Sequence, residues 1–233
     1  MSTKLIKAVL ENCSKATLVA ILNESPAELN KIDEDQRTAF HWACSMGSLE
    51  AIELFLDRKD ATINAQDEAG WTPFMIAICN KNNPESVLEE FLNREDLDIS
   101  ATTRGGQTCL HYAATKGRMR LLQLLCDRKP ELVRVKDRQG QQPLHRATAV
   151  GNVNAIKILL SHKAPLNASD SCGYTPLHFA LAEGHVDAAV ELVKAGADTL
   201  RVDKEGHTAM QCCPDRIVLQ EFIASCQNLN LDL

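Results

Sequence analysis

The stretch "YTPLHFALAEGHVDAAVELVKAGAD", residues 174–198, decides the fold. It contains two short amphipathic segments of helical period, separated by one glycine and followed by another. The same wording stands earlier in the chain as "QTCLHYAATKGRMRLLQLLCDR" at 107–128 and as "QQPLHRATAVGNVNAIKILLSHKA" at 141–164. Recurrence at a fixed period is the signature of a repeat architecture and not of a single active-site motif.

A hexapeptide defines the register of the repeats. It reads "TPLHFA" at 175–180, and its copies begin at Thr38, Thr72, Thr108, Gln142, Thr175 and Thr208. These starts are 34, 36, 34, 33 and 33 residues apart, and a degraded copy, "TKLIKA", begins at Thr3. The 233 residues are therefore expected to form one domain, 1–233, with units at approximately 1–35, 36–69, 70–105, 106–139, 140–172, 173–205 and 206–233.

Each position of the unit has a physical use. The Thr hydroxyl can accept a backbone N–H at the start of the first helix, and Pro suits the first helical position. Nine residues after the Thr, a glycine can take the left-handed conformation that ends this helix, as at Gly47, Gly117, Gly151 and Gly184. After the second helix a D-x-x-G turn leads to the next unit. The third unit has "NKNNPESV" in place of the glycine turn, and we expect Asn83 to cap its second helix.

This pattern resembles the ankyrin repeat, whose signature is a period near 33 residues with T-P-L-H-x-A. The resemblance covers nearly the whole chain. It implies an all-α fold, an ankyrin-repeat solenoid of about seven helix-turn-helix repeats with β-hairpin loops. Such units bury their apolar faces only against their neighbours, so the terminal units are expected to be atypical. Extended concave surfaces of this kind bind other proteins.

Composition narrows the function. The hydrophobic fraction is 45%, the charged fraction 24% and the formal net charge −6, which favours protein partners over nucleic acid. There is no run of eighteen apolar residues and no signal-like N-terminal segment, so no membrane span and no secretion are expected. The nine cysteines form no C-x-x-C pair. We expect reduced thiols, and therefore a protein of the cytoplasm and nucleus.

The histidines do not indicate catalysis. Four of the seven, His41, His111, His145 and His178, occupy the fourth place of the hexapeptide, which favours a bonding role between units. The other three, His162, His185 and His207, are expected to lie in solvent. A Cys–His nucleophile would also need an orienting group and an oxyanion site, and no phosphate-binding loop or G-x-S-x-G motif is present. We therefore expect a non-enzymatic protein with no cofactor and no metal site.

The residues around each hexapeptide start are the candidate binding surface. They share a period that places them on a face which the core does not use, and they include the residue types that anchor interfaces. Those just before the start are Arg37, Trp71 and Tyr174. Those four or eight places after the start are Trp42, Tyr112, Lys116, Arg146, Phe179 and Glu183.

A closer resemblance rests on "RTAFHWACSMG", "DEAGWTPF", "TCLHYAATKGR", "QPLHRATAVGN" and "TPLHFALAEGHVDAAVELV". These stretches are similar to the gankyrin family, and the last is nearest to its fungal members. The resemblance implies an assembly chaperone of the proteasome regulatory particle that binds the C-terminal domain of a proteasomal AAA ATPase subunit. Arg37 and Lys116 would then meet carboxylates, and Asp35, Glu68 and Glu183 would meet Lys or Arg. Trp42, Trp71 and Tyr112 would supply apolar contact.

Two alternatives and one departure remain at this point. Another ankyrin adaptor or inhibitor, for instance of a kinase, would share the fold and differ only in its surface side chains. An enzyme is the less favoured alternative. Mammalian gankyrins carry an L-x-C-x-E motif for retinoblastoma binding, whereas this chain has Leu181, Ala182 and Glu183 with no cysteine. That partner is therefore not implied, and the chain is expected to be a monomer without nucleic-acid or membrane partners.

Overall fold

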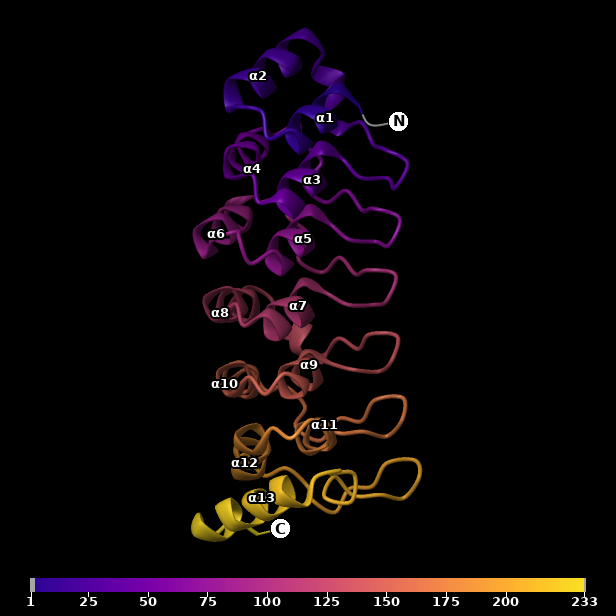
Figure 1. Ribbon diagram of the computed structural model, residues 1–233, viewed down its shortest axis with the longest axis vertical. Helices are drawn as coiled ribbons and strands as arrows, with labels where there is room; N and C mark the ends of the chain where they lie inside the picture. Colours follow the sequence, from indigo (N-terminus) through magenta and orange to yellow (C-terminus); the bar gives the residue numbers. More distant parts are fainter. Residues whose placement is uncertain (1–2, 233) are drawn as a thin grey trace. The chain divides into compact units, whose positions relative to one another are not determined.

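The computed structural model describes residues 3–232, and the regular secondary structure of this part is helical. The chain divides into two compact units, one up to Cys109 and one from Leu110 onward. The expected all-α repeat fold is confirmed within both units, because short helices follow one another in antiparallel pairs that are joined by loops (Figure 1).

The first unit stacks three helix pairs. The first helices α1, α3 and α5 contact one another in sequence, and the second helices α2, α4 and α6 form a parallel row (Figure 1). The bounds are α1 Lys4–Leu10, α2 Lys15–Glu24, a 3-10 turn Pro26–Asn30, α3 Ala39–Met46, α4 Leu49–Leu56, α5 Pro73–Cys79 and α6 Glu85–Asn93. The degraded first copy still begins as predicted, since the Thr3 hydroxyl accepts the Ile6 N–H at 3.3 Å.

The second unit continues the same arrangement. Contacts run from α9 to α11, from α8 to α10, from α10 to α12, and from α12 to the last helix α13. The bounds are α7 Cys109–Lys116, α8 Met119–Arg128, a 3-10 turn Pro130–Arg134, α9 Pro143–Ala149, α10 Val153–Ser161, α11 Pro176–Ala182, α12 Val186–Lys194 and α13 Arg216–Asn228. The last repeat lacks its first helix, because residues 209–212 form only turns.

Small and aromatic residues fill the space between the helix pairs. The alanine at the sixth place of the hexapeptide is fully buried at Ala43, Ala77, Ala113, Ala147 and Ala180. A methyl side chain there allows neighbouring first helices to approach closely. In the first unit, the Phe40 ring lies 5.3 Å from Phe91 and 5.5 Å from Phe55, centroid to centroid, which are favourable aromatic distances.

The hexapeptide histidine bonds two repeats together, as predicted. In the first unit, His41 Nδ1 accepts the Thr38 N–H at 3.1 Å, so Nε2 carries the ring hydrogen and donates it to the Trp71 carbonyl at 3.1 Å. His178 forms the equivalent pair of bonds in the second unit, from Thr175 N–H at 3.2 Å and to the next loop at 3.2 Å. Both ring nitrogens are therefore used by the backbone.

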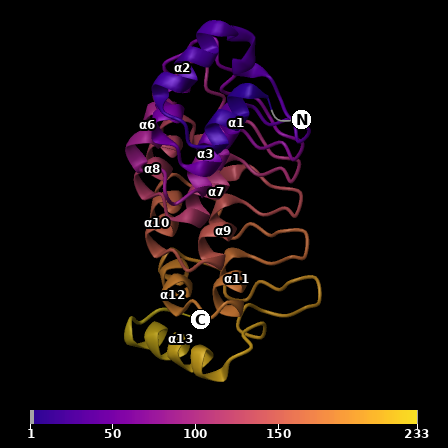
Figure 2. The same cartoon turned by 45° about the horizontal axis from the view of Figure 1, so that its top comes forward.

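The loops between helix pairs keep hairpin hydrogen bonds without forming strands in the described residues. Two isolated bridges occur, Ile32 with Thr38 and Val202 with Thr208. Successive tips are joined by single backbone bonds, such as Lys204 N–H to Cys172 O at 3.0 Å. Within the second unit, the loops before α9 and α11 project to the same side (Figure 2).

Two local expectations were wrong. Asn83 does not cap α6, because its Nδ2 donates to the carbonyls of Cys44 at 3.0 Å and Ala77 at 3.1 Å. It therefore satisfies the ends of two first helices, α3 of the preceding repeat and α5 of its own. His162 and His185 are half-buried, with bonds to the Ile158 and Ala149 carbonyls respectively. They were misplaced because each ring also contacts the preceding repeat, His162 at the Asp127 carboxylate and His185 at the Ala149 carbonyl.

The loop glycines lead to a first prediction. Gly173 has φ +90°, and a Cβ on it would lie 2.8 Å from the Lys204 backbone nitrogen, whereas Gly206, at φ +87°, has open space around it. Gly173→Ala should therefore lower the free energy of unfolding by about 2 kcal/mol or more, and Gly206→Ala by about 1 kcal/mol. Denaturant titration followed by circular dichroism measures both. Equal losses would contradict the close approach between neighbouring loops.

Burial of the hexapeptide histidine leads to a second prediction. Burial lowers the pKa of His111 from 6.5 to about 4, although its bond to the Gln141 carbonyl acts in the opposite direction. Below pH 6.5 the unfolded chain takes up this proton while the folded chain does not, so stability is complete above pH 6.5 and falls toward pH 4. The loss from this residue is about 3 kcal/mol.

The test compares unfolding free energies at pH 7 and pH 4.5 for the unsubstituted protein and for His111→Gln. The variant should have a lower free energy of unfolding at pH 7, but this free energy should fall less between pH 7 and pH 4.5 than it does in the unsubstituted protein. Leu125→Ala, which removes a fully buried side chain and no ionisable group, serves as the control and should keep the original pH dependence. Parallel pH profiles for all three proteins would refute the assignment.

Candidate functional site

The predicted binding residues fall into two patches, one in each unit. The N-terminal patch consists of Asp35, Arg37, Trp42, Glu68 and Trp71. The C-terminal patch consists of Tyr112, Lys116, Arg146, Tyr174, Phe179 and Glu183. They lie on the loops between helix pairs or on the first helices of the pairs, except Glu183, which directly follows the first helix α11. Their aromatic side chains and both arginines are half-buried, while Asp35, Glu68, Lys116 and Glu183 are exposed.

The N-terminal patch holds its large side chains by hydrogen bonds within the chain. The indole Nε1–H of Trp42 donates to Asp33 Oδ2 at 2.7 Å. Arg37 Nε donates to Asp67 Oδ2 at 3.1 Å, and the guanidinium lies 5.1 Å from the centre of the Trp42 ring. This distance suits a cation–π contact. Trp42 and Arg37 therefore present one ordered apolar and cationic surface.

Acidic side chains border this surface. Asp35 and Glu68 lie at neighbouring loop tips, and the Glu68 N–H donates to the Asp35 carbonyl at 3.0 Å. That backbone bond keeps the two exposed carboxylates on adjacent turns. Because two like charges on adjacent loop tips raise the local negative potential, the tips favour a partner that carries Lys or Arg.

In the C-terminal patch an ion pair orients an arginine. Arg146 Nη2 donates to Asp137 Oδ2 at 2.8 Å, and Asp137 is almost completely buried. Burial opposes the charged form of Asp137, but the bonds from Arg146 and from the Gln141 and Gln139 amides hold its pKa below the ordinary value of 3.8. The carboxylate therefore stays ionised and keeps the Arg146 side chain in place.

Two aromatic rings form the other half of the C-terminal patch. Tyr174 and Phe179 meet edge to face with centroids 6.0 Å apart. Phe179 also lies 5.8 Å from the His145 ring, and Tyr174 stacks 5.6 Å from His178. These contacts immobilise the inner faces of the rings while their outer edges remain accessible. Such half-buried rigid aromatics are effective anchors in protein interfaces.

Sequence reasoning missed the residues that hold the patches, namely Asp33, Asp67 and Asp137. They belong to the D-x-x-G stretches or their equivalent, which indicated only a turn. A signal was available, because Asp33 precedes Trp42 and Asp137 precedes Arg146 by the same nine residues. The bonds at these spacings were not predictable from turn chemistry alone.

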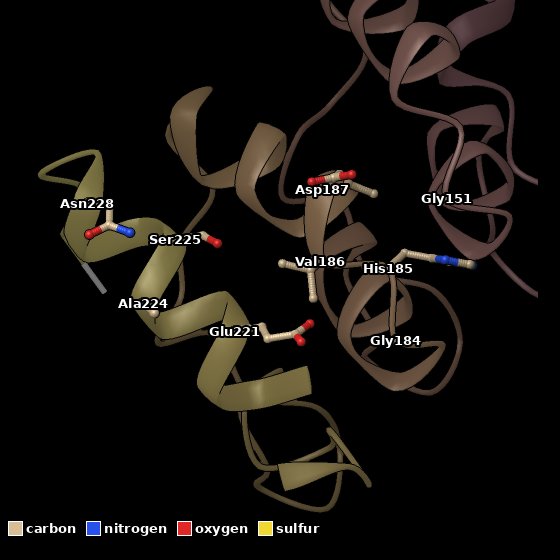
Figure 3. Close-up of a pocket in the computed structure, with 10 residues that line it drawn as sticks. Gly151, Gly184, His185, Val186, Asp187, Glu221, Ala224, Ser225 and Asn228 are labelled. Atoms are coloured by element: carbon tan, nitrogen blue, oxygen red, sulfur yellow. The ribbon is translucent and has the colours of Figure 1, made fainter. Parts of the chain in front are cut away.

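A groove in the second unit was also missed. It has a volume of about 600 Å³ and lies between the start of α12 and one face of α13. Asp187 and Glu221 line it, and Figure 3 shows Glu221 extending toward Val186 while His185 points away toward Gly151. Glu183 directly precedes the lining residue Gly184. Beyond Glu183, the acidic residue of the C-terminal patch, further acidic side chains therefore follow in the direction of α13.

The His and Cys side chains that could suggest catalysis are buried in the helical core. His41 uses both ring nitrogens in backbone bonds, and burial lowers its pKa. Cys44, three residues further along α3, is fully buried, and burial raises the pKa of its thiol well above 9.0. A thiol of that kind is a poor nucleophile at neutral pH.

Residues 3–232 contain no cluster of three or more His, Cys, Asp or Glu arranged for a metal ion. No helix within this range has the length and hydropathy to cross a membrane.

Comparison with known proteins identifies the periodic pattern. The family profile described as "Ankyrin repeats (3 copies)" matches residues 5–88 and 79–170, and the profile "Ankyrin repeats (many copies)" matches 159–213. An ankyrin repeat-containing protein of Schizosaccharomyces pombe is 56% identical over 227 residues, covering 97% of each chain. "Probable 26S proteasome regulatory subunit p28" of Saccharomyces cerevisiae is 40% identical over 208 residues, covering 87% of this chain and 90% of its own.

Solved structures show the same fold. The ankyrin repeat domain of Bcl-3 aligns with a TM-score of 0.73 at 24% identity and covers 95% of this chain and 98% of that domain. The ankyrin repeat domain of human ASB11 aligns with a TM-score of 0.75 at 21% identity and covers 95% and 97%. At these identities the similarity concerns the fold and not the binding surface.

The exposure of Glu183 gives a third prediction. Its side chain lies at the end of α11 in solvent, whereas the neighbouring Leu181 is fully buried. Glu183→Lys should change the free energy of unfolding by no more than about 0.5 kcal/mol. Leu181→Ala, the control, should cost about 2–5 kcal/mol because it leaves a cavity. Thermal and denaturant unfolding measure both, and a large loss for Glu183→Lys would show that this side chain is structural.

Proposed function

The chain belongs to the ankyrin-repeat family, and from this premise we propose that it is an assembly chaperone of the base of the proteasome regulatory particle. In this role it binds the C-terminal domain of one AAA ATPase subunit through the N-terminal and C-terminal patches. The observation that carries the proposal is its relative in Saccharomyces cerevisiae, which is named as a 26S proteasome regulatory subunit and aligns over 87% of this chain.

The chemistry of the two patches supports a partner with charges of both signs. Asp35 and Glu68 favour Lys or Arg on the partner, as does Glu183 at the other patch. Lys116 is exposed on the last turn of α7 and favours a carboxylate. Charges of both signs, spaced along an interface, set the register of a long partner and accelerate encounter. The ordered aromatic side chains then supply the desolvated contact on which affinity depends.

The proposed chaperone action follows from the size of the protein and from its position on the ATPase domain. A protein of 233 residues that is bound to the C-terminal domain of an ATPase obstructs whatever would dock beside that domain. We propose that it delays docking of the ATPase ring on the proteasome core until assembly is complete, in the cytoplasm and nucleus. No bond is made or broken in this role, which agrees with histidines and a thiol that are committed to packing.

A second function stays open because the same fold serves other partners. The Bcl-3 and ASB11 domains align almost end to end with this chain at identities below 25%. The fold alone therefore does not choose between a proteasome chaperone and another ankyrin adaptor or inhibitor, for instance of a kinase. Which of the two functions the chain has depends on which protein the side chains of the two patches bind, and a binding experiment decides between them.

The fourth prediction concerns the partner. In pull-downs with the isolated C-terminal domains of the six regulatory-particle ATPases, the protein should retain one domain. Trp71→Ala removes a half-buried aromatic anchor, and Lys116→Glu reverses an exposed charge. Each should weaken the measured affinity about tenfold or more, and Glu183→Lys should also weaken it. Calorimetry or interferometry with the retained domain gives the values.

The matched control is Lys163→Glu. It makes the same charge reversal in the same unit, at an exposed position after a second helix and away from the loop tips. It should leave the affinity nearly unchanged. Retention of none of the six domains would reject the proteasome proposal and favour a different ankyrin adaptor. Equal loss for Lys116→Glu and Lys163→Glu would mean that net charge, and not the patch, drives binding.

A further inference from the structure

We propose that the loop aspartates Asp33, Asp67 and Asp137 are positioning residues for partner recognition. The two oxygens of each carboxylate have different roles. One oxygen accepts the backbone N–H groups that close the turn, and the other holds a side chain of the binding surface in place. The inference rests on the proposed function only in that the held side chains, Trp42, Arg37 and Arg146, are those assigned to the partner.

The first oxygen has the same task in every loop that contains the aspartate. Oδ1 accepts the backbone N–H groups of the residues two and four places further along the chain. At Asp33 these are Asp35 and Arg37, at 3.0 and 2.9 Å. At Asp137 they are Gln139 and Gln141, both at 2.9 Å. This oxygen is therefore saturated by the turn and is not available to the surface.

The second oxygen takes one side-chain donor from the surface. Asp33 Oδ2 accepts from Trp42 Nε1 at 2.7 Å, and Asp137 Oδ2 accepts from Arg146 Nη2 at 2.8 Å. In both cases the donor is the residue nine places later, four after the start of the hexapeptide. Charge-assisted bonds of this length are the strong ones, so the donor is fixed in a single conformation.

Where the residue nine places later carries no donor, the preceding repeat supplies one. Asp67 is followed at that spacing by Ile76, and its Oδ2 accepts from Arg37 Nε at 3.1 Å. The same happens at Asp170, which is followed by Phe179 and whose Oδ2 accepts from Gln141 Nε2 at 3.4 Å. The second oxygen therefore accepts from whichever side-chain donor can reach it, from its own repeat or from the one before, and at Asp33, Asp67 and Asp137 this donor belongs to a binding patch.

Fixing these side chains in the free protein favours binding. Trp and Arg lose rotational freedom when a partner immobilises them, and this loss subtracts from the affinity. A side chain that is already held in its binding conformation avoids the loss. The arrangement also keeps the Arg37 guanidinium on the face of Trp42, so both groups meet the partner together.

Asp33→Asn separates the two tasks of the carboxylate. The amide oxygen can still accept the N–H groups of Asp35 and Arg37, so the turn remains. The amide nitrogen replaces Oδ2 and is a donor, and it cannot accept the indole N–H of Trp42. In the two-dimensional NMR spectrum of the full chain, the Trp42 indole resonance should move and its N–H should exchange faster with solvent. The Trp71 indole, the only other one in the chain, should be affected much less.

Asp170→Asn is the matched control. Its partner is the Gln141 amide, which can turn over and accept from the new amide nitrogen, so this loop should tolerate the same substitution. With the retained ATPase domain, Asp33→Asn and Asp137→Asn should each weaken binding about three- to tenfold, while Asp170→Asn should not. A double-mutant cycle with Trp42→Phe adds a readout that turn stability alone would not change. Once the indole donor is gone, Asp33→Asn should have little further effect on affinity.

The outcomes separate this inference from the proposed function. An unchanged Trp42 indole signal in Asp33→Asn would overturn the positioning role, whatever the partner. A released indole with unchanged affinity for the retained domain, or additive losses in the cycle, would also overturn it. If none of the six domains is retained while the indole is released only in Asp33→Asn and not in Asp170→Asn, the proteasome proposal fails and the positioning role stands.

Discussion

Each helix pair of this chain has an apolar face that only a neighbouring pair can bury, and the rest of the structure depends on this constraint. Within each unit, fully buried alanines such as Ala43 and Ala147 let successive first helices approach closely. The hexapeptide histidine then bonds the backbone of its own repeat to that of the next. Stacking therefore fixes the loops as well as the core, because every loop is bonded to a neighbour.

Within residues 3–232 the loops are ordered by turns and isolated bridges and not by a β-sheet, and aspartate side chains supply many of their hydrogen bonds. A loop aspartate such as Asp137 supplies the acceptors that strand pairing would otherwise provide. Since a carboxylate has two oxygens and the turn uses one, the other is left to orient a surface side chain. The same residue thus links the local backbone geometry of the loop to the orientation of the Arg146 side chain.

The buried and exposed polar groups of the chain have different surroundings. Buried titratable groups such as His41 and Cys44 have pKa values displaced by desolvation away from their reactive range, and the hydrogen-bonding capacity of His41 is used by the backbone. The exposed charges, among them Glu68 and Lys116, lie on loops and helix ends, where they are accessible to another protein. A groove lined by Asp187 and Glu221 extends the negative surface to the last helix.

The amino-acid sequence by itself determined the repeat, its register, and the start of the first helix in each repeat except the last. These follow from local rules of capping, glycine conformation and period, which need no distant contact. Only the tertiary structure decided that Asn83 serves the preceding repeat, that His185 is covered, and that Asp67 holds Arg37. Each of these depends on atoms some 30 or more residues apart in the chain, and their distance is set by how one repeat packs on the next.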